Sequence, residues 1–181
     1  MPTAPKVLFE RDFLEDEDLL YSLLVGNIVW DTRMRARKTA CFGQAYAYSG
    51  ISYPTVPMHP ALAPIAERLA TRIGHPFNNC LLNFYENGDA TMGFHSDSEE
   101  EIAEGTGVAI VSVGAERTLT FRSRQDRTAE FAYPLPGGSL LYMPPGIQEE
   151  WRHGVPKQEG VGGGRISLTF RQLREEDERR T

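Results

Sequence analysis

The 181-residue chain is poor in several features that define whole classes of protein. It has two cysteines, Cys41 and Cys80, which are too few for the disulfide framework of a small secreted domain. No apolar run approaches membrane-spanning length, and the N-terminus lacks the basic and then apolar pattern of a secretory signal. We therefore expect a cytoplasmic protein with reduced thiols and no membrane partner.

The chain also lacks an excess of basic residues, an internal repeat and a domain linker. Its formal net charge of −6 argues against a protein that coats nucleic acid through bulk electrostatics. Basic side chains are nevertheless concentrated at Arg33, Arg35, Arg37 and Lys38. The three arginines alternate, so on an extended strand they would share one face and hold a few phosphates. A solvated strand edge that is protected by its charge is the alternative.

The sequence does contain helical periodicity in its first part and short strands in the rest. Residues 14–25 predict an amphipathic helix, and residues 62–73 predict a second helix that ends at Gly74. The buried side of the first helix is expected to comprise Leu19, Leu20, Leu23 and Leu24.

Strands are expected at 80–86, 90–95, 108–113, 118–122, 129–133, 139–142, 150–153 and 165–171. Two helices followed by many strands indicate an α+β fold. We predict a double-stranded β-helix, or jelly-roll, core with the N-terminal helices packed on one sheet.

A candidate metal site begins with His95 and Asp97, which project from the same face if they lie on a strand. Two imidazoles and one carboxylate form the facial triad that holds non-heme Fe(II) and leaves coordination positions open. His153 would supply the second imidazole from elsewhere in the fold. A lone His-x-Asp motif occurs often by chance, so the assignment also depends on the C-terminal strand.

That strand, residues 165–171, alternates with a period of two. Its core-facing side comprises Ile166, Leu168 and Phe170, and its other side comprises Arg165, Ser167, Thr169 and Arg171. A guanidinium group can donate two parallel hydrogen bonds to a carboxylate, so two arginines facing one cavity suit a ligand with two carboxylates. Surface arginines on a solvated edge strand are the alternative.

Residues 81–85 predict a further strand, with Asn83 and Tyr85 on the face opposite the leucine and phenylalanine side chains. Asn87-Gly88 follows and favours a two-residue hairpin turn. The returning strand would place His95 beside this amide and phenol. A turn-adjacent Asn and a core Tyr are the alternative.

Together these segments resemble the AlkB family of Fe(II)- and 2-oxoglutarate-dependent dioxygenases over roughly residues 9–173. The resemblance is carried by segments 37–50, 81–99, 111–121, 138–143, 151–156 and 165–171. It implies a single AlkB-like dioxygenase domain over residues 1–181. Its parts would be N-terminal helices with a substrate-recognition extension at 1–79, a jelly-roll catalytic core at 80–173 and a charged tail at 174–181.

The resemblance also implies roles for individual residues. The positions that match iron ligands are His95, Asp97 and His153. The positions that match the 2-oxoglutarate site are Asn83, Tyr85, Arg165, Ser167 and Arg171. Arg165, helped by Tyr85, would bind the distal carboxylate, and Arg171 and Asn83 would lie near the metal-chelating end. Ser167 stands where many relatives have Asn.

Substrate contacts are implied in the same way. Tyr48 matches an aromatic residue that stacks on the damaged base, across from the ring of His95. Glu99 matches an acid that hydrogen-bonds the base. The remaining expected substrate contacts are Tyr46, Arg33, Arg35 and Arg37.

The implied activity is oxidative demethylation of N-alkylated bases in DNA or RNA, as in alkylation damage repair. Fe(II), 2-oxoglutarate and O2 would be required, and aldehyde, succinate and CO2 released. The chain shows no long basic extension, so we expect it to act on single-stranded or locally opened nucleic acid. We also expect a monomer. Two alternatives stay open: the same chemistry on a small molecule or protein side chain, and a catalytically silent nucleic-acid-binding module.

Overall fold

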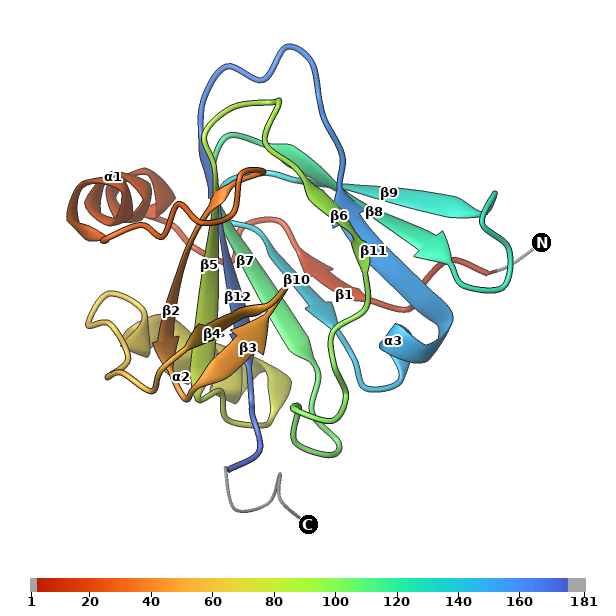
Figure 1. Ribbon diagram of the computed structural model, residues 1–181, viewed down its shortest axis with the longest axis horizontal. Helices are drawn as coiled ribbons and strands as arrows, with labels where there is room; N and C mark the ends of the chain where they lie inside the picture. Colours follow the sequence, from red (N-terminus) through yellow and green to blue (C-terminus); the bar gives the residue numbers. More distant parts are fainter. Residues whose placement is uncertain (1–2, 176–181) are drawn as a thin grey trace.

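A computed structural model describes residues 3–175, and its core consists of two antiparallel sheets that face each other (Figure 1). The larger sheet has the order β1 (Leu8–Glu10), β10 (Leu140–Met143), β7 (Val108–Gly114), β12 (Arg165–Arg171), β5 (Asn79–Tyr85) and β2 (Lys38–Gly43). The smaller sheet has the order β6 (Met92–His95), β11 (Trp151–Val155), β8 (Arg117–Ser123) and β9 (Glu130–Leu135). This arrangement confirms the predicted jelly-roll core.

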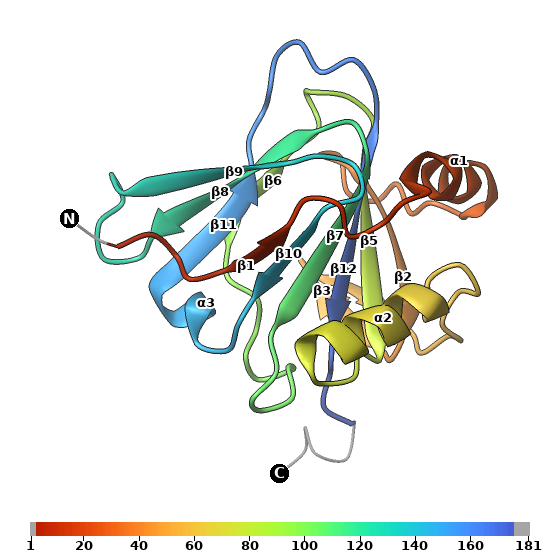
Figure 2. The same ribbon diagram turned by 180° about the vertical axis from the view of Figure 1, so that it is seen from behind.

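Two N-terminal helices, α1 (Glu17–Asn27) and α2 (Ala63–Ile73), cover the outer face of the larger sheet, as predicted (Figure 2). Leu24, Leu62 and Leu69 of this layer pack against sheet residues that include Leu168 and Phe170. The helix α2 ends at Gly74, whose φ of 98° is the left-handed conformation that glycine adopts at helix ends. A short hairpin of β3 (Tyr46–Tyr48) and β4 (Ile51–Tyr53) and the single turn α3 (Ile147–Glu150) complete the fold.

The second core lies between the two sheets. It contains Leu81 and Ile110 from the larger sheet and Leu119 and Phe121 from the smaller one. Strand β12 pairs with β7 on one side and β5 on the other, and all seven of its residues are buried. The solvated edge strand considered for residues 165–171 is therefore excluded.

The buried side of α1 differs from the prediction. Leu24 is buried, but Leu19 and Leu23 are 72% and 41% exposed. The helix instead turns Glu17, Leu20 and Leu24 toward the sheet, and a Glu17 carboxylate oxygen accepts a 2.8 Å hydrogen bond from the Gly114 backbone N–H. This contact with the end of β7 sets the rotation of the helix, which leucine spacing alone did not reveal.

The hairpin predicted at Asn87-Gly88 is wrong. Strand β5 belongs to the larger sheet, whereas β6 belongs to the smaller one and pairs with β11. Gly88 does not adopt a positive φ, which a type I′ turn would require. A Cβ atom at this glycine would collide with the carbonyl oxygen of Gln158. The glycine therefore permits close backbone packing where the chain passes from one sheet to the other.

The extended basic strip was also predicted incorrectly. Residues 33–37 form bends, and β2 begins only at Lys38. The three arginines consequently do not share one face, because Arg33 and Arg35 are exposed whereas Arg37 is 6% exposed.

The remaining strands lie within two residues of their predicted positions. Residues 176–181 of the expected charged tail lie outside the described residues. Within residues 3–175, none of the helices combines the length and the apolar character needed to span a membrane.

The central place of β12 generates a stability prediction. Leu168→Ala should lower the free energy of unfolding by about 2–5 kcal/mol, because it leaves a cavity at a fully buried position. The matched control, Leu19→Ala on the exposed side of α1, should change it by less than about 0.5 kcal/mol. Urea unfolding followed by circular dichroism would measure both, and equal effects would contradict the described packing.

Candidate active site

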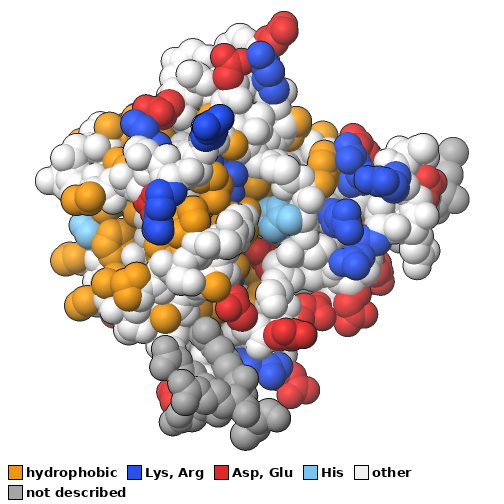
Figure 3. All heavy atoms as spheres, viewed as in Figure 1, with side chains coloured by type: hydrophobic (Ala, Val, Ile, Leu, Met, Phe, Trp, Pro, Cys, Tyr) orange, Lys and Arg blue, Asp and Glu red, His pale blue; other side chains and the backbone are white. Residues whose placement is uncertain are grey.

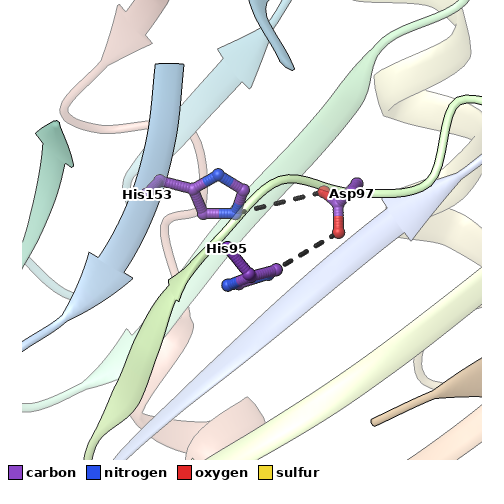
Figure 4. Close-up of side chains that lie close together, drawn as sticks. All are labelled: His95, Asp97 and His153. Carbon is purple, nitrogen blue, oxygen red and sulfur yellow. Dashed lines mark ion pairs between the residues drawn. The ribbon is translucent and has the colours of Figure 1, made fainter. Parts of the chain in front are cut away.

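Three potential metal ligands come together between the two sheets (Figure 4). His153 on β11 lies directly across from His95 on β6, and Asp97 follows two residues beyond the end of β6. One ligand atom from each residue lies within 4.8 Å of the others. His95 Nε2 is 3.7 Å from Asp97 Oδ1, and His153 Nε2 is 4.0 Å from Asp97 Oδ2. The structure thus brings together all three predicted iron ligands.

Asp97 is held by two different parts of the fold. Its Oδ1 accepts a 2.8 Å hydrogen bond from Arg171 on β12, and its backbone N–H donates to Oε1 of Gln148 on α3. Burial alone would raise the pKa of Asp97, but Arg171 and the two imidazoles outweigh it and hold the pKa at about 2. Asp97 is therefore ionised at neutral pH, and its buried Oδ2 has no hydrogen-bond partner.

Each of the two imidazoles can offer a ring nitrogen to a metal. Nδ1 of His95 donates to the Gly93 carbonyl at 3.0 Å, which leaves Nε2 free to bind a metal. Burial, the largest effect, lowers the pKa of His153 to about 3 despite the opposing effect of Asp97. His153 is accordingly neutral at physiological pH, as a metal ligand must be.

The site has the donor atoms and the burial that a divalent metal ion requires. Two imidazoles and one carboxylate are the donor set of mononuclear non-heme Fe(II), and the unpartnered Asp97 Oδ2 is a buried acceptor that a cation would satisfy. The donor set and its burial fit Fe(II).

Arg165 on β12 supplies unpartnered buried atoms of the opposite charge. Its NH2 donates to Ser112 Oγ at 2.8 Å, whereas its Nε and NH1 have no partner although the side chain is 1% exposed. Burial lowers the pKa of Arg165 to about 10, so the group is still a cation at neutral pH. A carboxylate would provide the missing charge and acceptors, so the residue fits the role of a co-substrate anchor.

The other predicted co-substrate residues line the same narrow cavity: Asn83, Tyr85, Ser167 and Arg171. Ser167 lies between Asn83 and Ser112 in the strand register. The Tyr85 hydroxyl contacts Met92 Sδ at 3.6 Å, and its ring lies 5.3 Å from the Arg165 guanidinium carbon. The sequence did not indicate Ser112, because its role depends on register between distant strands.

Arg37 is buried against residues that line this cavity. Its guanidinium donates to Asn83 Oδ1 at 2.7 Å, to the Thr91 carbonyl at 3.1 Å and to the Tyr48 hydroxyl at 3.0 Å. The side chain therefore links the co-substrate residue Asn83 to the aromatic residue at the mouth of the site. Its predicted contact with phosphate does not fit this burial.

Tyr48 lies beside His95, and the two rings meet edge to face at 5.7 Å with an interplanar angle of 75°. A base stacked between two parallel rings would need them farther apart, so Tyr48 would have to move to admit one. Tyr46 is 4% exposed and packs against Arg171 and Tyr48, which makes it a support of the site and not a surface contact.

Glu99 does not line the cavity that contains Tyr48 and His95. It is exposed and borders a separate hollow between residues 99–108 and 143–149. The expected hydrogen bond from Glu99 to a base would therefore require this loop to move.

Comparisons with known proteins agree with this geometry. A sequence model of the 2OG-Fe(II) oxygenase superfamily matches residues 23–171. The chain is 37% identical over 147 residues to the DNA oxidative demethylase ALKBH2 of Mus musculus, an alignment that covers 76% of this chain and 62% of the relative. It is 30% identical over 177 residues to alpha-ketoglutarate-dependent dioxygenase alkB homolog 3 of Homo sapiens, covering 87% of this chain and 62% of the relative.

The chain thus spans about three fifths of the length of these curated relatives. A solved structure, that of OsALKBH1, superposes with a TM-score of 0.70 and covers 95% of this chain and 100% of that one, at 18% identity. This likeness supports the jelly-roll fold. The sequence matches confirm the predicted resemblance to AlkB proteins.

The triad generates a prediction about metal affinity. Asp97→Ala should weaken Mn²⁺ binding, a spectroscopic substitute for Fe(II), by about 100-fold or more, because the only anionic ligand is lost. Electron paramagnetic resonance of free Mn²⁺ would measure the affinity, with circular dichroism to confirm folding. Asp126→Ala, at an exposed carboxylate, is the control and should bind as the parent does. Unchanged affinity in Asp97→Ala would remove Asp97 from the metal site.

A second prediction concerns Arg165. Arg165→Lys keeps the charge but loses the planar fork, so the dissociation constant for 2-oxoglutarate should rise by about tenfold or more. Calorimetric titration of the Mn²⁺-loaded protein would measure it. Arg72→Lys, at an exposed arginine of α2, should leave the constant unchanged. Equal affinity in both variants would contradict the assignment of Arg165.

Proposed function

The chain belongs to the 2OG-Fe(II) oxygenase superfamily, and from this premise we propose that it is an oxidative demethylase of N-alkylated nucleobases. The family implies Fe(II), 2-oxoglutarate and O2 as its cofactor and co-substrates. When bound, they supply the oxidation of a C–H bond while 2-oxoglutarate becomes succinate and CO2. On an N-methyl group the outcome is release of the carbon as aldehyde and restoration of the base.

One observation carries the oxygenase part of this proposal. Buried residues of the site between the two sheets have unpartnered polar atoms of opposite charge, among them Asp97 Oδ2 and the Nε and NH1 of Arg165. A cation would satisfy the first and a carboxylate the second. A catalytically silent nucleic-acid-binding module has no need for either group, so this alternative is disfavoured.

The residues of this chain would act mainly by binding and orientation. Arg165 and Ser112 would fix the distal carboxylate of the co-substrate, and Arg171 would keep Asp97 oriented toward the metal. The apolar side chains of Leu119 and Val155, which line the same cavity, would exclude water.

The nucleic-acid part of the proposal is supported by the relatives. One is named a DNA oxidative demethylase, and Tyr48 and His95 place two aromatic rings beside the metal site, which a base can contact once Tyr48 has moved away from His95. We infer that the protein acts on single-stranded or locally opened DNA or RNA, because extraction of a base from a duplex costs a few kcal/mol. We also propose that it is a cytoplasmic monomer.

A second candidate function is the same oxygenase chemistry on a small molecule or protein side chain. The closeness of the Tyr48 and His95 rings favours it, because the cavity would have to widen before a base could enter. The exposed position of Glu99, outside the cavity, points in the same direction.

Mass spectrometry of methylated DNA and RNA oligonucleotides incubated with the protein, Fe(II) and 2-oxoglutarate would separate the two functions. Tyr48→Ala should slow demethylation by one to two powers of ten, because base stacking contributes roughly 1–3 kcal/mol. It should affect demethylation more than it affects uncoupled 2-oxoglutarate consumption. Tyr48→Phe, which keeps the ring and loses only the hydrogen bond from Arg37, is the control. Consumption of 2-oxoglutarate without demethylation of any oligonucleotide would favour the second function.

A further inference from the structure

We propose that the phosphodiester backbone of the nucleic acid binds to the outer face of the smaller sheet, at an arginine cluster that the sequence did not indicate. The cluster comprises Arg122, Arg124, Arg127 and Arg152, which surround a hollow that also contacts Phe94 and Ser123. The identity of the ligand rests on the proposed function, whereas the existence of a polyanion-binding surface does not.

The cluster is assembled from segments that are distant in sequence. Arg122 lies on β8, Arg124 and Arg127 lie on the loop between β8 and β9, and Arg152 lies on β11. Arg152 is directly opposite Arg122 in the pairing of β11 with β8. Like charges directly opposite each other destabilise a sheet, and a bound anion would relieve this repulsion.

Few anionic groups of the protein offset this charge. Arg122 stacks on Phe94 at 3.7 Å and pairs with Glu130 at 2.6 Å. Arg124 donates only to neutral oxygens, those of the Ser96 hydroxyl and the Gln148 carbonyl. Within residues 3–175, no ion pair joins a carboxylate to Arg124, Arg127 or Arg152. Three guanidinium groups thus remain unneutralised although the chain has a net charge of −6.

The cluster lies next to the metal site. Arg152 precedes His153 on β11 and Phe94 precedes His95 on β6, so the cluster and the imidazoles occupy opposite faces of the same two strands. Because β6 is the edge of its sheet, a polymer can pass around this strand from the outer face to the mouth of the cavity. On the molecular surface seen in Figure 3, a histidine side chain lies next to a group of basic side chains.

Several guanidinium groups around an open hollow suit a polyanion better than a single small carboxylate. The strip predicted from sequence is a weaker candidate for this role. Arg33 is already paired with Asp31, and Arg37 is buried against Asn83 and Tyr48, so only Arg35 is left exposed without a described partner.

The test measures binding of an unmodified, fluorescein-labelled single-stranded oligonucleotide by anisotropy across a range of KCl concentrations. Arg124→Gln/Arg127→Gln/Arg152→Gln removes three charges and leaves Arg122 in place. The dissociation constant should rise by about tenfold or more, and the slope of log K against log salt should become shallower by about 2. Because Arg124 also contacts Ser96, the double variant Arg127→Gln/Arg152→Gln is measured too and should lower the slope by about 1.4.

The control is Arg11→Gln/Arg68→Gln/Arg72→Gln, which removes three exposed arginines, two on the helix α2 and one in the segment that leads to α1. It should keep the parent slope, and Arg33→Gln/Arg35→Gln should change the slope by less than the double variant does. Circular dichroism checks the fold of each protein. DNA and RNA of one sequence and phosphatidylserine vesicles serve as separate probes.

Equal losses in the cluster variants and the control variant would overturn the proposal, as would failure of the parent to bind either nucleic acid. Binding to the vesicles that depends on the cluster, without binding to oligonucleotides, would also overturn it in favour of a membrane surface. None of these measurements requires turnover. If the proposed demethylase function is wrong but the binding surface is real, the oligonucleotides will bind in a cluster-dependent way and will not be demethylated.

Discussion

The buried ion pair between Arg171 and Asp97 is the interaction on which the site depends. Arg171 belongs to the central strand of the larger sheet, whereas Asp97 follows the edge strand of the smaller one, so the pair connects the two sheets at the metal site. Both side chains are at most 3% exposed. Removing one partner would leave an unpaired buried charge, which is strongly destabilising. The pair is therefore better understood as fixing the orientation of Asp97 than as adding stability.

Strand β12 can hold Arg171 in this pair because it lies between two neighbouring strands, with the helices on one face and the cavity on the other. Its apolar residues, such as Leu168, face the helices, and its polar residues face the cavity. Being central, the strand has neighbours on both sides that fix its register, and this register sets Ser112 beside Arg165. The positions of the charged groups are thus determined by packing on the opposite face of the same strand.

Much of this arrangement could be predicted from sequence, because alternation and residue chemistry are local properties. The strands and the second helix follow from such patterns, whereas the convergence of His153 with His95 and Asp97 was implied by the resemblance to AlkB proteins. The failures involve long-range structure. The Asn87-Gly88 segment has the composition of a hairpin, yet it connects two sheets. The sequence also could not show that Arg37 is buried, because its partners Asn83 and Thr91 are 46 and 54 residues away.

The same dependence on long-range structure explains why the distribution of charge around the site could not be predicted from the sequence. Alternation along residues 33–37 suggested one basic surface, but the bends in this segment turn its arginines in different directions. Strand pairing creates another basic surface by placing Arg152 opposite Arg122, which are 30 positions apart in the sequence. The two faces of the smaller sheet then have different chemistry: imidazoles for a metal on the inner face and guanidinium groups for an anion on the outer face. A polymer whose base enters the cavity and whose phosphates stay outside would contact both faces at the edge formed by β6.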